Sequence, residues 1–351
     1  MRNIFRLLSN GIVALLSCTL LLLATSCTSN GKKLHIYCWA DTISPSLIEK
    51  FEAEYGCQIV IDTYDTNESM YAKLKAGAQG YDIIVPSSYQ LDLLAQQKMI
   101  HELDLTKIPN VKYIDLSLLP QDGVPPLKEG IPFHVAFSSI GYRKDRVENP
   151  QPTWAMFSRE DLRGRMTMLN DPREIIGAAL KFLGYSANSR SAKEIYEATQ
   201  TIIGWKRNLS KFESEQYSSG LASAEFLLSY GYNGDLLRIM NENPDVAILY
   251  AKEGTLIGVD HLTIPQGAPN IDLAHNFINF MLQPENAAIN IQHVFFYSPN
   301  IAAYELLPPK LKNNPGLIPS ADILRQSEVI KDLGADSRLY YSAWDVIKAA
   351  P

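Results

Sequence analysis

The sequence predicts an α/β protein in which parallel strands alternate with helices, and two observations carry that prediction. Short apolar runs alternate with segments whose apolar residues recur at helical spacing. Alternation of strand and helix is the pattern of a parallel sheet with helices on its faces. No proline- or glycine-rich linker divides the chain, so two lobes would be joined by strands that cross between them.

The N-terminal part of the pattern is strand, helix, strand, helix, strand. Residues 34–38 form an apolar run of strand length. Ser44 and Pro45 open a helix as its N-cap and first helical residue, and Gly56 ends it. The other three elements are a strand at 58–62, a helix at 67–76 and a strand at 81–85. Right-handed crossovers are expected between these strands.

The alternation continues through the rest of the chain, whose last third is mostly helical in pattern. Strands are expected at 131–142, 165–169, 246–250 and 256–264. Helices are expected at 171–183, 192–206, 222–228 and 271–282. The segments 131–142 and 250–260 are the candidates for strands that cross between the lobes.

The N-terminus has the pattern of an export signal. Arg2 and Arg6 precede an apolar stretch, about residues 11–24, that is too short to span a bilayer comfortably. The small residues before Cys27 resemble a bacterial lipobox, whose cysteine is lipidated and becomes the new N-terminus. We therefore expect a signal peptide at 1–26 and a lipidated tether at 27–33. The alternative is an ordinary cleaved signal with an incidental Cys27.

Composition narrows the class of partner. The formal charge is −6, and lysine and arginine are scattered without a basic run. This argues against nucleic acid as a partner and is compatible with a cationic ligand. Roughly 325 residues remain after the signal, which is enough for two domains with their own cores.

The two cysteines of the mature chain outside the lipobox are expected to be free thiols. Cys38 lies at the end of the first predicted strand and Cys57 at the start of the second. In adjacent parallel strands they fall at opposite ends, farther apart than the about 7 Å between α-carbons that a disulfide allows. We expect both thiols to be mostly buried.

Motifs of enzymes and metal sites are absent from the sequence. The six histidines are far apart and form no His-x-x-x-His pair. Neither a Gly-x-Ser-x-Gly elbow nor a phosphate-binding glycine loop occurs. We expect a protein without catalysis, cofactor or metal, although scattered serine, histidine and aspartate residues can still converge in a fold.

Seven short strings carry a resemblance to a known family. They are YCWAD at 37–41, ESMYAKLK at 68–75, YDIIVPSSY at 81–89, NDPRE at 170–174, LGYS at 183–186, DHLTIP at 260–265 and YSPN at 297–300. In order and spacing they resemble the spermidine/putrescine-binding proteins of bacterial polyamine importers, over nearly the whole mature chain. The family resemblance implies a type II periplasmic-binding-protein fold, with two α/β lobes that close on a ligand.

The resemblance also implies a division of the chain and a set of partners. One lobe would hold residues 34–136 with 257–306, and the other residues 137–256 with 307–351. The implied protein is a lipid-anchored monomer that faces the periplasm, binds putrescine or spermidine, and delivers it to the permease of an ABC importer. Alternatives are the same fold binding another amine, a cation or an amino acid, or an exported enzyme.

The resemblance implies ten ligand-binding residues: Trp39, Asp41, Ser87, Tyr89, Asp171, Glu174, Ser214, Tyr232, Asp260 and Phe296. The chemistry agrees, because buried ammonium groups need carboxylates and the methylenes between them suit aromatic faces. The first four residues follow predicted strands, at the edge where parallel sheets bind ligands. Each also has a structural alternative as a core, turn or helix-start residue.

The carboxylates give the clearest signals. Asp171 and Glu174 stand where a helix N-cap and its capping-box partner would be, and a cap leaves one carboxylate oxygen available for an amine. Asp260 is a lone acid in an apolar run, which is costly without a cation; the alternative is a paired core acid. The family has aromatic residues where Gly258 and Thr42 stand, and glutamine near Ile330, so the choice of polyamine stays open.

Overall fold

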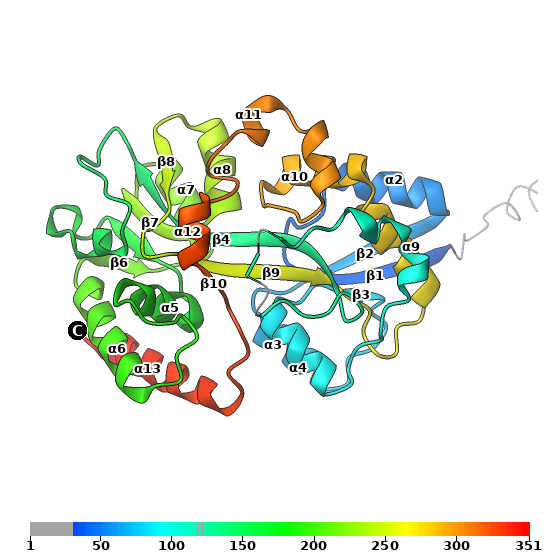
Figure 1. Cartoon of the computed structure of the whole chain (residues 1–351), viewed down its shortest axis with the longest axis horizontal. Helices are drawn as coiled ribbons and strands as arrows, with labels where there is room; N and C mark the ends of the chain where they lie inside the picture. The colour runs from blue at the N-terminus through cyan, green and yellow to red at the C-terminus, as the bar shows by residue number, and fades with distance from the viewer. Residues whose placement is uncertain (1–30, 118, 121–122) are drawn as a thin grey trace, which may run out of the picture.

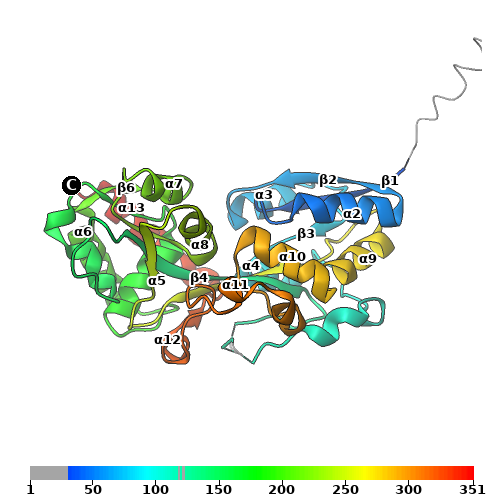
Figure 2. The same ribbon diagram turned by 90° about the horizontal axis from the view of Figure 1, so that it is seen from above.

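The computed structural model describes residues 31–117, 119–120 and 123–351. The predicted signal peptide and Cys27 lie outside the described residues. The chain forms a three-stranded sheet of order β2-β1-β3 and a seven-stranded sheet of order β10-β9-β4-β7-β5-β6, with β8 paired to β4. Helices surround both sheets, and Figures 1 and 2 show two lobes side by side.

The first lobe contains the strands and helices predicted for the N-terminal part. Strands β1 (Lys32–Cys38), β2 (Cys57–Thr63) and β3 (Ile83–Ile84) are parallel. The helices are α2 (Pro45–Tyr55), α3 (Asn67–Lys75), α4 (Ser88–Gln96) and, from later in the chain, α9 (Ile271–Met281). Gly56 ends α2 as predicted, with φ +61° and its N–H bonded to Glu52 O, whereas the Ser44 side chain makes no cap bond.

The second lobe is built around β5 (Met166–Met168), β6 (Leu209–Phe212), β7 (Leu228–Tyr232) and β8 (Val246–Leu249). Its helices are α5 (Pro172–Phe182), α6 (Ala192–Lys206), α7 (Tyr217–Ala222), α8 (Asn233–Glu242) and α13 (Ser337–Ala349). The sheet is mixed, because β5 is parallel to β6 and β7 whereas β4 is antiparallel to β7 and β8.

The predicted helix at 222–228 is wrong. Helix α7 ends at Ala222, the chain turns through Ala224 at φ +58°, and β7 begins at Leu228. Leu228 pairs with Tyr142 on one side and with Met166 on the other, so it belongs to a central strand. Apolar residues spaced for a helix also suit a strand that is buried on both faces, and the two neighbouring strands decide between them.

Two long strands connect the lobes. Strands β4 (Ile131–Arg143) and β9 (Leu256–Leu262) pair antiparallel, with His134 opposite Asp260 and Ala136 opposite Gly258. Figure 1 shows that β4 runs from the first lobe into the second and that β9 returns from the second lobe to the first, close to the crossing segments expected from the sequence. Strand β10 (Glu328–Val329) pairs parallel to β9 and leads the chain to α13, a third connection that the sequence did not predict.

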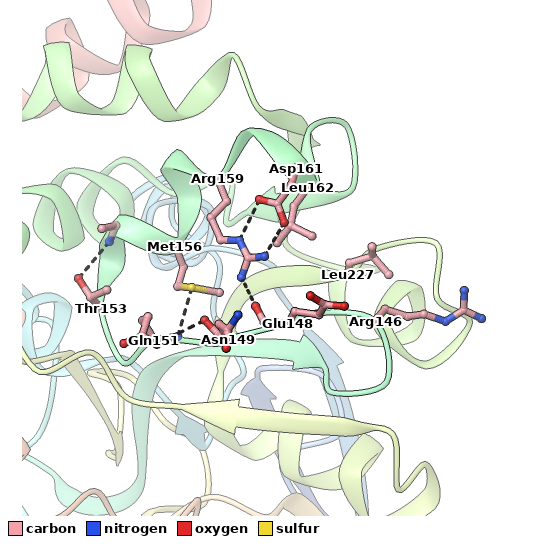
Figure 3. Close-up of a pocket in the computed structure, with 11 residues that line it drawn as sticks. Arg146, Glu148, Asn149, Gln151, Thr153, Met156, Arg159, Asp161, Leu162 and Leu227 are labelled. Atoms are coloured by element: carbon pink, nitrogen blue, oxygen red, sulfur yellow. Dashed lines mark hydrogen bonds and ion pairs between the residues drawn. The ribbon is translucent and has the colours of Figure 1, made fainter.

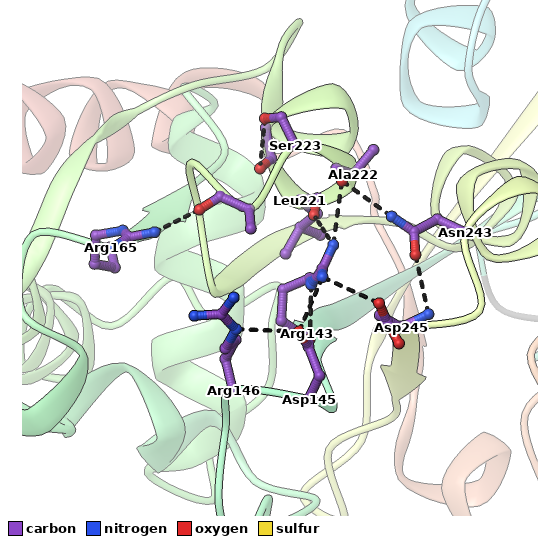
Figure 4. A network of polar contacts seen from close by, with 11 residues as sticks. Arg143, Asp145, Arg146, Arg165, Leu221, Ala222, Ser223, Asn243 and Asp245 are labelled. Carbon is purple, nitrogen blue, oxygen red and sulfur yellow. Dashed lines mark hydrogen bonds and ion pairs between the residues drawn. The ribbon is translucent and has the colours of Figure 1, made fainter.

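A buried arginine fixes β4 in the second lobe (Figure 4). The Arg143 guanidinium binds both carboxylate oxygens of Asp145, at 2.8 and 3.0 Å, and Asp245 at 3.3 Å. It also donates to the carbonyls of Leu221 and Ala222 at the end of α7. The network therefore ties the end of β4 to the segments that lead into β7 and β8.

The apolar core follows the same division. One large buried cluster draws on residues 34–133 and 262–282, and the other on residues 140–256 and 330–347. A smaller cluster around Val135, Ile257 and Val329 lies on the connecting strands. The remaining helices are α10 (Pro284–Val294), α11 (Pro309–Lys312) and α12 (Ala321–Gln326), and short 3-10 turns η1 to η6 occur at Leu105–Lys107, Pro109–Tyr113, Trp154–Ser158, Glu160–Leu162, Ile301–Leu306 and Gly334–Asp336.

The cysteine prediction is confirmed in its main point. In the parallel pair of β1 and β2, Cys57 lies opposite Lys32 and Cys38 opposite Thr63, and both thiols are free. Cys38 is buried, which raises the pKa of its thiol to about 12, whereas Cys57 is only half-buried. In the described part of the chain no helix is long and apolar enough to cross a membrane.

Candidate functional site

The candidate site begins where the first lobe meets β9. Asp260 on β9 forms an isolated backbone bridge with Ser87, which follows β3. The Ser87 hydroxyl donates to Asp260 Oδ1 at 2.7 Å. Burial raises the pKa of Asp260 to about 6, although the donors of Ser87 and Trp39 oppose the shift. The carboxylate of Asp260 is therefore hydrogen-bonded, but no cation among the described residues pairs with it.

Asn67 joins the residues around Ser87, although no sequence pattern marks it as a site residue. Its buried side-chain amide donates to Ser87 Oγ at 3.1 Å and to the Tyr89 hydroxyl at 3.0 Å, and its Oδ1 accepts from the Ser87 N–H at 3.1 Å. In the sequence Asn67 is only a plausible helix-start residue. The fold thus links two predicted site residues, Ser87 and Tyr89, through one amide.

Trp39 contributes an aromatic wall beside Asp260. Its indole N–H donates to Val85 O at 3.1 Å, and its ring centroid lies 4.6 Å from that of Tyr64. Tyr64 is buried, and its pKa is raised by that burial and then by the charge of Asp260. Tyr64, which the sequence did not single out, therefore borders the same carboxylate.

Asp171 caps α5 with one oxygen. Its Oδ1 accepts the backbone N–H groups of Arg173 at 2.7 Å and Glu174 at 3.1 Å, so the structural reading of this residue is correct. Its other oxygen accepts no hydrogen bond from the described part of the chain. The cap therefore leaves the second oxygen of Asp171 available.

Glu174 does not complete a capping box. Its Oε2 instead accepts the hydroxyls of Ser138, on β4, and Tyr230, on β7, both at 2.6 Å. Its residue is 3% exposed, and burial, followed by the charge of Asp171, raises the pKa of Glu174 to about 7. Within residues 31–117, 119–120 and 123–351, no group donates to Oε1.

Acidic and phenolic groups of the two lobes face each other. Burial raises the pKa of Asp171, and the charge of Glu68 on α3 of the first lobe adds to the shift. Glu68 Oε1 also accepts, at 3.4 Å each, the hydroxyls of Tyr89 and of Tyr341 on α13. The nearby cation, Arg173, is buried against the Tyr340 ring and donates to Lys331 O and Asn188 Oδ1, so it is turned toward other partners.

The other predicted residues fall into different groups. Tyr232 is half-buried, and its pKa is raised by burial and then by Glu174 and Asp171, which places it beside them. The ring centroid of Phe296 lies 6.1 Å from that of His134, and His134 is the residue of β4 that stands opposite Asp260. Ser214 is exposed and supports the loop before Asp171, since it accepts the Asn170 N–H at 2.9 Å. Asp41 is exposed, with φ +55°, and no recorded contact joins it to the others.

The departures from the family pattern also have clear positions. Among the described residues, a Cβ on Gly258 would meet only Ala136 Cβ, at 3.9 Å, so they leave the space beside Asp260 open there. Thr42 is buried and donates to Trp39 O at 2.7 Å. Ile330 is buried in the core of the second lobe. Gly258 is therefore the departure that enlarges the candidate site.

The arrangement suits a cation with more than one charge. Asp171 and Glu174 each accept protein donors on one oxygen and present the other without a hydrogen bond from the described residues, and Asp260 accepts from Ser87 but has no cationic partner among them. Aromatic groups lie beside them, and buried carboxylates call for cationic partners. The described residues contain no group of three metal-ligating side chains that could hold a metal ion.

A separate pocket in the second lobe does not offer the same chemistry (Figure 3). It has a volume of about 470 Å³ and shares no residue with the ten predicted ones. Arg159, one of its charged groups, already binds Asp161 at 2.5 and 3.0 Å and Glu148 O at 2.7 Å. The carboxylate of Asp161 is therefore already paired with an arginine inside this pocket.

Comparisons with known proteins agree on one class of molecule. Residues 46–319 match the family model described as bacterial extracellular solute-binding protein. The chain is 31% identical to a spermidine/putrescine-binding periplasmic protein of Escherichia coli, over 91% of this chain and 92% of the relative. It is 32% identical to a putrescine-binding periplasmic protein of Pseudomonas aeruginosa, over 92% and 93%.

Solved structures resemble the chain over similar lengths. A putative spermidine/putrescine ABC transporter protein of Listeria monocytogenes superposes with a TM-score of 0.85 at 31% identity, covering 91% of this chain and 100% of the other. A lipoprotein of Treponema pallidum superposes with a TM-score of 0.81 at 33% identity, covering 90% and 99%. The predicted two-lobed fold is confirmed by these similarities.

Proposed function

The chain belongs to the bacterial extracellular solute-binding protein family, and from that premise we propose that it captures polyamines and delivers them to an ABC importer. The observation that carries the proposal is the set of three buried carboxylates, none of them paired with a cation in the described part of the chain, beside aromatic side chains. Relatives named for binding spermidine or putrescine support it. The protein acts by binding and release, without catalysis.

The proposed binding mode follows from the geometry of the carboxylates. Asp260 pairs with one ammonium, beside Ser87 and Trp39. Asp171 and Glu174 serve the other end of the ligand, with Tyr89 and Tyr232 against its methylenes. The lobes, divided at 34–136 with 257–306 and 137–256 with 307–351, close around the ligand by bending at the connecting strands. A monomer is sufficient for this mode, and the partner is the importer's permease.

Titration calorimetry of the purified protein tests the proposal. Putrescine, cadaverine, spermidine and spermine are compared with neutral amino acids. We expect one polyamine to bind per chain and the amino acids to give no heat, because they cannot pair with acids at both ends of the site. Binding of an amino acid with no polyamine binding, or chemical conversion of the amine, would favour the alternative functions.

The proposed location is the periplasmic face of a bacterial membrane, held by lipid on Cys27. The lipobox-like residues before Cys27 and the lipoprotein among the similar structures support it. The variant Cys27→Ser should carry no lipid and should leave the membrane fraction, because several acyl chains are what hold such a protein firmly. Labelled palmitate measures this, and label retained by Cys27→Ser would contradict the anchor.

The open space at Gly258 bears on the choice of polyamine. We expect putrescine to bind at least as tightly as spermidine, because a wall that could grip the longer chain is missing. The variant Gly258→Trp should shift the affinity ratio toward spermidine. Gly204→Trp is the matched control, since Gly204 lies in α6 with open space around it, outside the site. A parent protein that prefers spermidine by about tenfold, 1.4 kcal/mol, contradicts the prediction.

A further inference from the structure

Glu174 presents a problem that the proposed function does not solve. A carboxylate that meets an ammonium has to be ionised, yet Glu174 is almost fully buried and lies beside a second acid, Asp171. Burial and a neighbouring like charge both favour the protonated form. A proton on Glu174 would remove the charge that the ligand needs. Some feature of the fold has to stabilise the ionised form.

Two hydroxyls from different strands converge on one oxygen of this carboxylate. Tyr230 on β7 and Ser138 on β4 both donate to Glu174 Oε2 at 2.6 Å, and both residues are buried. Oε1 receives no such bond from the described residues. Glu174 Oε1 does not belong to the fully buried polar atoms without a hydrogen-bond partner. Since no described residue donates to it, the oxygen is unpaired and still reached by solvent.

The position of the Tyr230 hydroxyl is set by packing. Residue Tyr230 is 0% exposed, and its ring centroid lies 4.8 Å from that of Trp154 and 6.5 Å from that of Phe157. Its backbone is paired with Ile140 of β4. A ring held in this way has little freedom to turn its hydroxyl elsewhere, so the donor is preorganised for Glu174.

We propose that Tyr230, together with Ser138, is a positioning residue for ligand binding, which holds Glu174 Oε2 so that Oε1 faces the ligand in its ionised form. The inference rests on the proposed function, because it assigns Glu174 to the cation site. Nothing in the sequence pointed to Tyr230, which lies in the segment just after the one predicted to be helical.

The charges around Glu174 contribute to the rise in its pKa that the two hydroxyls oppose. On α5, Asp171 raises the pKa of Glu174 and Arg173 lowers it. On β7, the pKa values of Tyr230 and Tyr232 are raised well above their usual value, first by burial, so both phenols stay neutral near pH 7. Ser138 on β4 does not titrate. Hydrogen bonds from the two strands to the ionised carboxylate therefore counter the effect of burial on Glu174.

The test is the variant Tyr230→Phe, which keeps the ring and removes the hydroxyl. Putrescine affinity is measured by calorimetry from pH 5.5 to 8.5. We expect the acidic limb of the profile to move up by about one pH unit, because one donor to a charged group is lost. Affinity should fall about tenfold near pH 7 and approach that of the parent at pH 8.5. Ser138→Ala should shift the profile in the same direction.

Two further variants separate positioning from simple packing. Tyr185→Phe is a matched control, because the Tyr185 hydroxyl also donates to a carboxylate, that of Glu197 at 2.7 Å, away from the site. It should leave the profile unchanged. In a Glu174→Gln background, Tyr230→Phe should no longer shift the profile, because the titrating group is gone. Should Tyr230→Phe fail to fold, Ser138→Ala carries the same test.

A second readout separates this inference from the proposed function. Carbon-13 NMR of labelled glutamate in the ligand-free protein should show a higher pKa of Glu174 in Tyr230→Phe than in the parent. That result together with a parent that binds no polyamine would retain the positioning role and reject polyamine binding. A folded Tyr230→Phe protein with the parent's pKa of Glu174 and the parent's binding profile would overturn the inference.

Discussion

Asp260→Asn is expected to weaken polyamine binding by about 30-fold or more while leaving the protein folded. The substitution keeps the size and shape of the side chain but removes the charge that meets an ammonium. Leaving a buried charge without its partner typically costs about 2–5 kcal/mol. Folding should survive, because burial already raises the pKa of Asp260 to about 6 and the ligand-free site loses a desolvated acid.

Calorimetry with putrescine measures the loss, and thermal melting shows whether the variant is folded. Asp322→Asn is a suitable control, since it removes the same charge from an exposed residue of α12 that pairs with Arg325 at the surface. The control separates a local effect from a change in net charge. A folded Asp260→Asn protein that binds putrescine as tightly as the parent would remove Asp260 from the site.

Polyamine affinity should fall by about 100-fold or more between pH 8 and pH 5. The pKa of Glu174 is raised to about 7 and that of Asp260 to about 6, both chiefly by burial. Each group loses its charge as the pH falls below its own pKa, and each costs about tenfold in affinity per pH unit below that value. The amine ligand stays protonated throughout, so the loss belongs to the protein.

Stability of the ligand-free protein should respond in the opposite sense. An acid whose pKa is higher in the folded than in the unfolded state binds protons more tightly when folded, so its contribution to stability grows as the pH falls from about 7 to about 4. The rise in melting temperature caused by putrescine should therefore be large at pH 8 and nearly absent at pH 5. Equal ligand-induced shifts at the two values would contradict the assignment of these acids to the site.

The ion pair of Arg143 with Asp145 in the second lobe persists between pH 8 and pH 5. Its loss is therefore not expected to contribute to the fall in polyamine affinity. The Arg143 guanidinium holds the pKa of Asp145 to about 2, well below its usual value. The stability that this pair contributes is present above the unfolded pKa near 4 and is lost only toward pH 2. Asp145→Asn should thus leave the pH dependence of putrescine binding unchanged.

The sequence predicted most elements because their causes are local. Spacing of apolar residues, caps and glycine stops located α2, α5, α6 and α9, and the long apolar run located β4. The failure at 222–228 has the opposite cause, since β7 is a strand by virtue of its neighbours β4 and β5. The two-residue strand β10 carries no periodicity at all and exists only because it pairs with β9.

The sequence by itself determined the α/β class, the positions of three acids, and, through seven strings in register, the family. What it did not determine is how each acid is held, because those contacts join residues far apart in the chain. Ser87 meets Asp260 across 173 positions, and Tyr230 meets Glu174 across 56. Of the three acids, only Asp171 has contacts that could be predicted from the sequence, because a helix cap joins residues within three positions of each other. Hydrogen bonds between strands depend on register, and register is fixed only when the whole sheet assembles.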